Sequence, residues 1–244
     1  MSFVITMWVR EGIVMASDSR LTLNTTVPSG EKQVIQVAVG MSDSSYKTFL
    51  TPNGVGISTF GAADIGGVPL TGYIESFINE NLTSTSVPVE QIPRMLSDYF
   101  CRFSLPPDTH FHVAGYKSEG GTFEQQIWNV SVARAQINRL NPPGEQGVSW
   151  GGEGDILSRL LQNVIVISAN GEAQELPHFQ IPYQFFTLQD AVDFCVFAVR
   201  STIDAIRFQP RAKTVGGPID VVVIKPDEAF WIQRKQLTIP SYGG

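Results

Sequence analysis

Short runs of apolar and β-branched residues dominate the first sixty positions of the chain. Residues 3–9 and 12–17 are two such runs, separated by a polar Arg10-Glu11 pair, which predicts a β-hairpin. A polar segment at 22–32 interrupts the pattern. Further runs of the same kind lie at 34–39, 47–50 and 55–60. The chain is therefore expected to open with strands.

Apolar residues recur at helical spacing in four later segments, arranged as two successive pairs. These segments are 65–78, 92–103, 156–161 and 188–206, with Thr187 as the expected N-cap of the last. Alternating strands are expected between the two pairs, and further strands near the end, at 110–115, 123–132, 219–224 and 229–232. The Gly- and Pro-containing stretch 168–187 predicts an irregular surface excursion.

The order of these elements limits the fold class. Strands, two helices, strands, two helices and final strands do not alternate as a doubly wound parallel sheet requires. Two packed antiparallel sheets covered by helices on both outer faces is the simplest solution, an α+β fold with four αββα layers. A length of 244 residues suits one core, so a single domain spanning 1–244 is expected.

Composition excludes several classes of function. The net charge is −6 and the 17 basic residues are scattered, which argues against binding to nucleic-acid phosphates. No apolar stretch is long enough to span a bilayer, and the opening residues lack the basic region of a secretory signal, so a soluble cytoplasmic protein is expected. The only cysteines, Cys101 and Cys195, lie in apolar surroundings and are expected to be buried and inert.

Metal and cofactor motifs are weak. His110 and His112 lie on one face of a predicted strand, but no third ligand can be located, so we expect no metal. The glycine-rich pieces at 65–67, 151–154 and 216–217 match no phosphate-binding fingerprint and are interpreted as turns. No cofactor is expected.

Four stretches together resemble a known family. The opening from Ser2 to Arg20, Lys47, the turn Gly61-Ala-Ala-Asp64 and the late run 216–224 occur in the order and spacing of the β subunits of the proteasome core particle and their bacterial relatives. Val113-Ala-Gly-Tyr and the Gly152-Glu-Gly turn add to the match, which covers nearly the whole chain. The resemblance implies an N-terminal-nucleophile hydrolase fold, a peptide or protein substrate, and self-association into a ring or stacked rings.

Candidate catalytic residues follow from chemistry and from this resemblance. A hydroxyl needs a base, and a terminal amine with a pKa of about 8 can serve the residue that carries it, so Ser2 qualifies once Met1 is removed. The resemblance implies Asp18 and Lys47 as the supporting ion pair and the Gly61 N–H as the oxyanion donor. Without the resemblance, the Asp18–Lys47 pair could be structural and Gly61 could be a turn glycine.

The chain departs from the family pattern at several positions. Ser2 stands where the family has Thr, and Glu153 replaces a supporting Ser, which is expected to bring a carboxylate near the terminal amine. Ala212 and Val215 replace a supporting Asp and Ser. Three functions therefore remain open: a peptidase or amidohydrolase acting through Ser2, a catalytically inactive ring-forming scaffold, and a small-molecule amidase on the same fold. Any unfoldase partner is not visible in the sequence.

Overall fold

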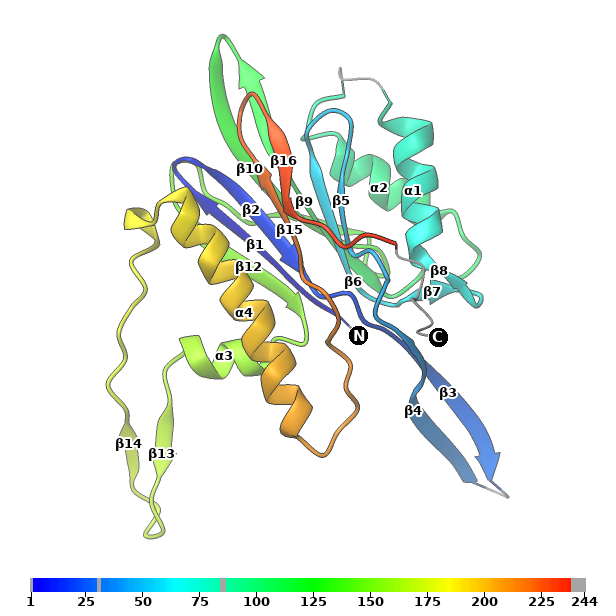
Figure 1. Cartoon of the computed structure of the whole chain (residues 1–244), viewed down its shortest axis with the longest axis vertical. Coiled ribbons are helices and arrows are strands. Elements are labelled where there is room, and N and C mark those ends of the chain that lie inside the picture. Colours follow the sequence, from blue (N-terminus) through cyan, green and yellow to red (C-terminus); the bar gives the residue numbers. More distant parts are fainter. Residues whose placement is uncertain (1, 30–31, 84–86, 238–244) are drawn as a thin grey trace, which may run out of the picture.

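The computed structural model describes residues 2–29, 32–83 and 87–237 (Figure 1). Its main body has two five-stranded antiparallel sheets, with α3 and α4 on one outer face and α1 and α2 on the other (Figure 1). Three hydrophobic clusters fill the layers: one between each sheet and its helices, and one between the sheets. The αββα architecture expected from the sequence is therefore confirmed.

The first sheet has the strand order β12-β1-β2-β15-β16. Its strands are β1 (Phe3–Val9), β2 (Gly12–Ser17), β12 (Gly147–Gly152), β15 (Asp220–Ile224) and β16 (Ala229–Gln233). The predicted hairpin of β1 and β2 forms with Val9 opposite Gly12. Every residue of β1 and β2 is buried, because helices cover one face of this sheet and the second sheet covers the other.

The second sheet has the order β11-β10-β9-β6-β5. Its strands are β5 (Thr48–Leu50), β6 (Gly56–Gly61), β9 (Thr109–Glu119), β10 (Thr122–Ser131) and β11 (Gln136–Arg139). The β9–β10 hairpin turns at Gly120-Gly121, both with positive φ. Strand β11 was not predicted, because it is short, lies at a sheet edge and lacks an apolar run.

The helices α3 (Asp155–Leu161) and α4 (Leu188–Phe208) cover the first sheet. As predicted, Thr187 caps α4: its hydroxyl accepts from the Asp190 N–H, and the Asp190 carboxylate accepts from the Thr187 N–H, which completes a capping box. Cys195 on α4 is buried, and this burial raises the pKa of its thiol. Cys101 is exposed, so the expectation that both cysteines are buried was wrong for this one.

The helices α1 (Leu70–Asn81) and α2 (Ile92–Cys101) cover the second sheet with a cluster of aromatic side chains. Helix α1 begins later than its apolar pattern predicted, since Gly66 and Gly67 have φ of +60° and +82° and turn the chain between the short strands β7 (Asp64–Ile65) and β8 (Val68–Pro69). The aromatic rings pack edge to face or tilted, and they belong to Phe77, Tyr99, Phe100, Phe103 and Phe111.

Two hairpins project from the layers (Figure 1). The first joins β3 (Leu21–Ser29) to β4 (Lys32–Ser42), so the predicted polar interruption at 22–32 is largely a strand. The second joins β13 (Ile165–Ile167) to β14 (Ala173–Glu175). We call residues 162–182, which contain this second hairpin, the arm. The stretch predicted to be irregular thus contains a short strand, and a 3-10 turn (Tyr183–Phe185) follows the arm.

Candidate active site

Ser2 lies at the start of β1, held by the end of the neighbouring strand β12. Its carbonyl oxygen accepts from the Glu153 N–H at 2.8 Å, and only 8% of the residue is exposed. Gly152 has a φ of +88°, and a Cβ there would lie 1.7 Å from the Ser2 oxygen, so only glycine fits beside Ser2. Met1, whose removal the mechanism needs, lies outside the described residues.

Asp18 directly follows β2 and is fully buried. Each of its carboxylate oxygens accepts two hydrogen bonds. The four donors are Phe3 N (2.9 Å), Lys47 Nζ (2.7 Å), Arg20 N (3.1 Å) and Gly216 N (3.0 Å). A buried carboxylate with this many donors is satisfied in its charged form. Asp18 therefore joins the start of β1 to the loop before β15.

Lys47 precedes β5, and its carbonyl accepts from the Thr59 N–H of β6 at 2.8 Å. Its ammonium donates to the same Asp18 oxygen that accepts from the Phe3 N–H, which places the ion pair beside the residue that follows Ser2. Burial lowers the pKa of Lys47 below its usual value, while the charge of Asp18 opposes this shift. The structure thus brings Ser2, Asp18 and Lys47 together.

A cavity of about 20 Å³ adjoins this group. A void of this size holds about one water molecule. The residues that line it come from the start of β1, from the segments around β3, β5 and β6, and from α1. They are Ser2, Arg20, Leu21, Ser45, Tyr46, Lys47, Thr59, Ala62, Ala63, Leu70 and Thr71. The candidate nucleophile and the candidate lysine therefore line the same small space.

Gly61 ends β6 but is not among the residues that line this cavity. Its φ is +107°, and a Cβ there would lie 2.6 Å from the Asp108 carbonyl oxygen. Glycine is therefore required at this position for packing, whatever its backbone N–H does. The next two residues, Ala62 and Ala63, do line the cavity.

Glu153 contributes its backbone to Ser2, whereas its carboxylate accepts from Arg211 at 3.0 Å. The anionic group expected near the amine is therefore already paired with a cation. Arg211 also donates to Asp155 at 3.2 Å. Val215, which replaces a supporting serine of the family, is buried in the cluster between the first sheet and its helices. The arginine was not singled out in the sequence because its partners lie more than fifty positions away.

Two further ion pairs near the site were also missed. The Arg20 guanidinium binds the Asp43 carboxylate with two hydrogen bonds, of 2.6 and 2.8 Å, and this contact lowers the pKa of Asp43. Lys235 and Asp220 form a second buried lysine–aspartate pair. A carboxylate inside the apolar run Ile219-Asp-Val-Val-Val-Ile was a signal that a buried cation must lie nearby.

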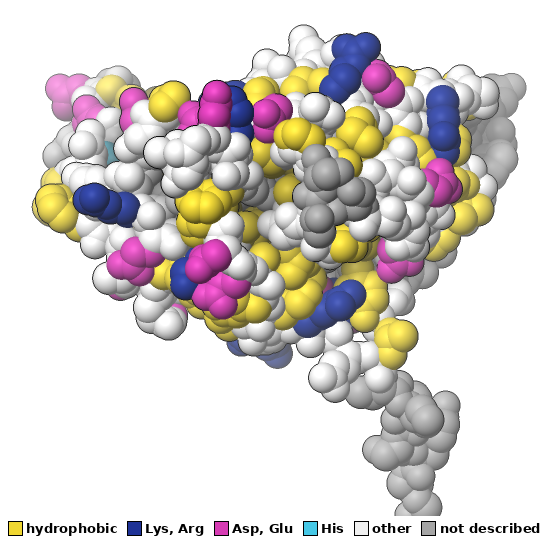
Figure 2. Space-filling view, turned by 90° about the horizontal axis from the view of Figure 1, so that it is seen from above, with side chains coloured by type: hydrophobic (Ala, Val, Ile, Leu, Met, Phe, Trp, Pro, Cys, Tyr) yellow, Lys and Arg dark blue, Asp and Glu magenta, His cyan; other side chains and the backbone are white. Residues whose placement is uncertain are grey.

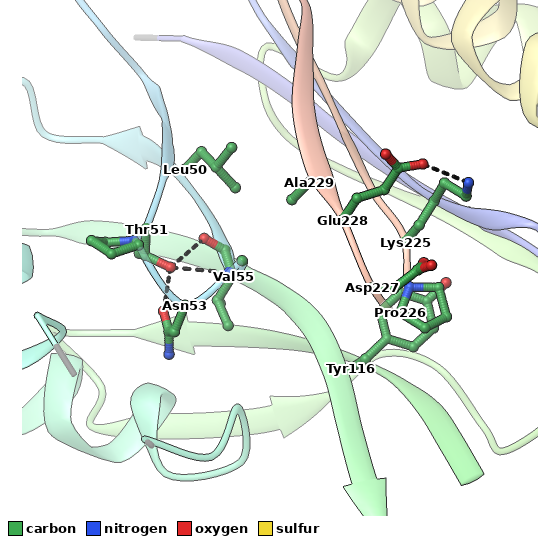
Figure 3. Close-up of a pocket in the computed structure, with 12 residues that line it drawn as sticks. Leu50, Thr51, Asn53, Val55, Tyr116, Lys225, Pro226, Asp227, Glu228 and Ala229 are labelled. Atoms are coloured by element: carbon green, nitrogen blue, oxygen red, sulfur yellow. Dashed lines mark hydrogen bonds and ion pairs between the residues drawn. The ribbon is translucent and has the colours of Figure 1, made fainter. Parts of the chain in front are cut away.

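A larger hollow of about 340 Å³ lies at the opposite end of the sheets, between the turns 50–55 and 225–229 (Figures 1 and 3). Tyr116 lies beside the second turn, and Lys225 pairs with Glu228 at 2.7 Å on its rim. None of the candidate catalytic residues lines this hollow. The face in Figure 2 shows acidic and basic side chains interspersed among apolar ones.

The two histidines of β9 have packing roles. His112 is buried, its Nδ1 lies 3.0 Å from the Thr6 hydroxyl, and burial lowers its pKa to about 4. His110 stacks on Phe60 with the ring centroids 5.1 Å apart. Within the described ranges no cluster of three or more His, Cys, Asp or Glu side chains could hold a metal ion, and no described helix is long and apolar enough to cross a membrane.

The four αββα layers, two antiparallel sheets with helices on both outer faces, are those of the N-terminal-nucleophile hydrolase fold. Among solved structures, the chain is similar to an Anbu (Gly-1) mutant from Hyphomicrobium sp. strain MC1. The identity is 16% and the TM-score 0.57, over 99% of this chain and 89% of that chain, so the likeness shows the fold. No protein-family model and no curated protein matches this chain.

Proposed function

We propose that this chain is a proteasome-like hydrolase of peptide or amide bonds, with Ser2 as its N-terminal nucleophile after Met1 is removed. The observation that carries the proposal is the Asp18 carboxylate, one oxygen of which binds both the Lys47 ammonium and the N–H that follows Ser2. A charged pair buried against the backbone of the candidate nucleophile fits catalysis better than stability, because burying an ion pair costs desolvation energy.

The reaction begins with proton transfer from the Ser2 hydroxyl to the free amine of the same residue. The Ser2 Oγ then forms a bond to the substrate carbonyl carbon, the C–N bond breaks, and the leaving amine takes the proton. The product of this step is an ester on Ser2. A water molecule hydrolyses the ester with the amine again as base, and the cavity beside Ser2 has room for about one water.

Four neighbours support these steps in the proposal. The Lys47 cation lowers the pKa of the Ser2 amine, so that the amine is a free base near neutral pH, and it stabilises the developing oxyanion. Asp18 fixes Lys47. The Gly61 N–H is the proposed oxyanion donor, and Arg211 keeps the Glu153 carboxylate occupied beside Ser2.

Mass spectrometry and active-site labelling test this function. Protein from its native host is expected to lack Met1, and an electrophilic peptide probe is expected to label Ser2. Ser2→Ala should abolish labelling, whereas Ser118→Ala should not, because Ser118 is exposed near the β9–β10 turn. A small amide probe tested in parallel separates a peptidase from a small-molecule amidase.

Retained Met1 together with unlabelled Ser2 contradicts the proposal and favours a catalytically inactive scaffold. When Met1 is retained, the nitrogen of Ser2 belongs to a peptide bond and cannot act as the base. The core position of Val215, where the family has a serine, is the observation that favours that second reading.

We also propose that the chain self-associates, with a second copy of itself covering the arm. The arm exposes Val164, Ile165, Val166, Ile167, Leu176 and Phe179. Exposed large apolar side chains gathered on one segment are typical of a surface that binds another protein. A ring in the cytoplasm is the form that the family resemblance suggests.

A further inference from the structure

A second buried lysine–aspartate pair lies close to the first. Asp220, the first residue of β15, is fully buried, and the Lys235 side chain that contacts its carboxylate is 4% exposed. The Lys235 N–H also donates to Asp220 at 2.8 Å. Burying two such charges costs free energy that their mutual attraction does not reliably return. A stabilising role alone therefore explains this pair poorly.

The sheet register places this pair beside the candidate active site. Asp220 lies opposite Ser17, the residue before Asp18, in the pairing of β15 with β2. The Ser17 hydroxyl accepts from Thr48, the residue after Lys47, at 2.9 Å. Both buried pairs therefore occupy the same end of the first sheet.

Tyr46 connects the second pair to the first. The Lys235 ammonium lies 4.4 Å from the centroid of the Tyr46 ring, and the Tyr46 hydroxyl donates to the Lys235 carbonyl at 3.5 Å. Arg234 lies over the same ring at 5.1 Å. Tyr46 precedes Lys47 and lines the cavity that Ser2 lines. The segment after β16 thus fixes the residue next to the candidate lysine.

We propose that Lys235, held by Asp220, is a positioning residue of the candidate active site and acts on Lys47 both through its charge and through Tyr46. The proposal rests on the proposed function, in which Lys47 serves Ser2. The family resemblance included Asp220 only as a member of the run 216–224 and gave it no role, and no motif of the sequence included Lys235.

The charged groups around Lys47 come from several elements. Asp18 follows β2 and favours the ammonium, as does Asp43 after β4, which is itself paired with Arg20. Burial is the largest cause of the lowered pKa of Lys47, and the cation of Lys235 adds to the lowering. Lys235 therefore makes Lys47 easier to deprotonate, whereas Asp220 limits this effect by neutralising Lys235.

Opposite substitutions in the second pair should shift the titration of Lys47 in opposite directions. Lys235→Met removes the neighbouring cation, leaves Asp220 as an uncompensated anion, and should raise the pKa of Lys47. Asp220→Asn leaves Lys235 as an uncompensated cation and should lower it. The neutral double variant should lie between the two single variants, because both charges are removed.

Carbon-13 NMR of labelled lysine side chains measures this titration directly, with the Lys47 signal assigned by its loss in Lys47→Arg. Lys225→Met is the matched control, since Lys225 pairs with Glu228 on the exposed turn at the other end of β15. The control should leave the midpoint unchanged. Circular dichroism shows whether each variant is folded. If one single variant does not fold, the double variant is compared with the single variant that does. The double variant must then shift the Lys47 midpoint by less than that single variant.

Shifts of the same sign in both single variants, or no shift in folded variants, overturn the proposal. The pH profile of Ser2 labelling provides the second readout. Its alkaline limb should move with the Lys47 midpoint, because the proposed function needs Lys47 as a cation. If wild-type Ser2 is never labelled, the hydrolase function fails, yet the NMR titration still decides whether Lys235 controls Lys47.

Discussion

The end of the sheets around Ser2 and the arm depart from ordinary burial in opposite directions. Around Ser2, the carboxylates of Asp18 and Asp220 are fully buried. On the arm, Phe179 is 87% exposed and Ile167 is 73% exposed. Charged side chains are seldom buried without partners, and large apolar patches are seldom left in water.

The difference lies in where the compensating groups are. Each buried carboxylate has its partners within the same chain, such as the four donors around Asp18. The large apolar side chains of the arm are exposed, so no other described part of the chain covers them. Changes at the charged end should therefore act on the stability of the folded chain, and changes in the arm should act on association.

Asp18→Asn should have the largest effect on stability. The substitution leaves the Lys47 ammonium buried without its counter-ion, and breaking a buried pair in this way costs about 3–5 kcal/mol. Urea denaturation measures the loss. Asp43→Asn is the control, since Asp43 is 45% exposed in its pair with Arg20 and should cost no more than about 1 kcal/mol. Equal losses in the two variants would contradict the comparison.

His112 should have an intermediate effect that depends on pH. Its pKa is about 4 in the folded chain and about 6.5 when unfolded, so the unfolded state binds the proton first as pH falls. The stability is fully present above pH 6.5 and is lost as pH falls toward 4, by about 2 kcal/mol between pH 7.5 and 5.

Urea denaturation at pH 7.5 and 5 checks this prediction. His112→Gln should remove most of the pH dependence, whereas His178→Gln should leave it unchanged, because His178 is an exposed residue of the arm. A pH dependence that survives in His112→Gln would show that another group is responsible.

Substitutions in the arm should have the smallest effect on the stability of the folded chain. Replacing Ile167 and Phe179 together by Ser should change the free energy of unfolding of the monomer by less than about 0.5 kcal/mol, because both are exposed. The same change should reduce the mass measured by light scattering. Phe123→Ser on β10 is the control, at 52% exposure outside the arm. A wild-type monomer would exclude the proposed interface.

Local patterns in the sequence predicted most of the elements. The β1–β2 hairpin and the Thr187 cap follow from residues within a few positions of each other. Strand β13 was not predicted, and β14 lies within a stretch expected to be irregular, because these strands have three residues each and pair only with each other. The start of α1 was misplaced since its apolar spacing continues through the turn at Gly66.

The sequence by itself determined the layers of this protein and three neighbouring candidates, Ser2, Asp18 and Lys47, through periodicity and family resemblance. Only the tertiary structure decided which groups beyond the Asp18–Lys47 pair compensate the buried charges. Asp18 accepts from Gly216, 198 positions away, and Asp220 meets Lys235 across a strand turn. Such contacts depend on how the strands pack, and a residue type alone carries no information about a partner so distant along the chain.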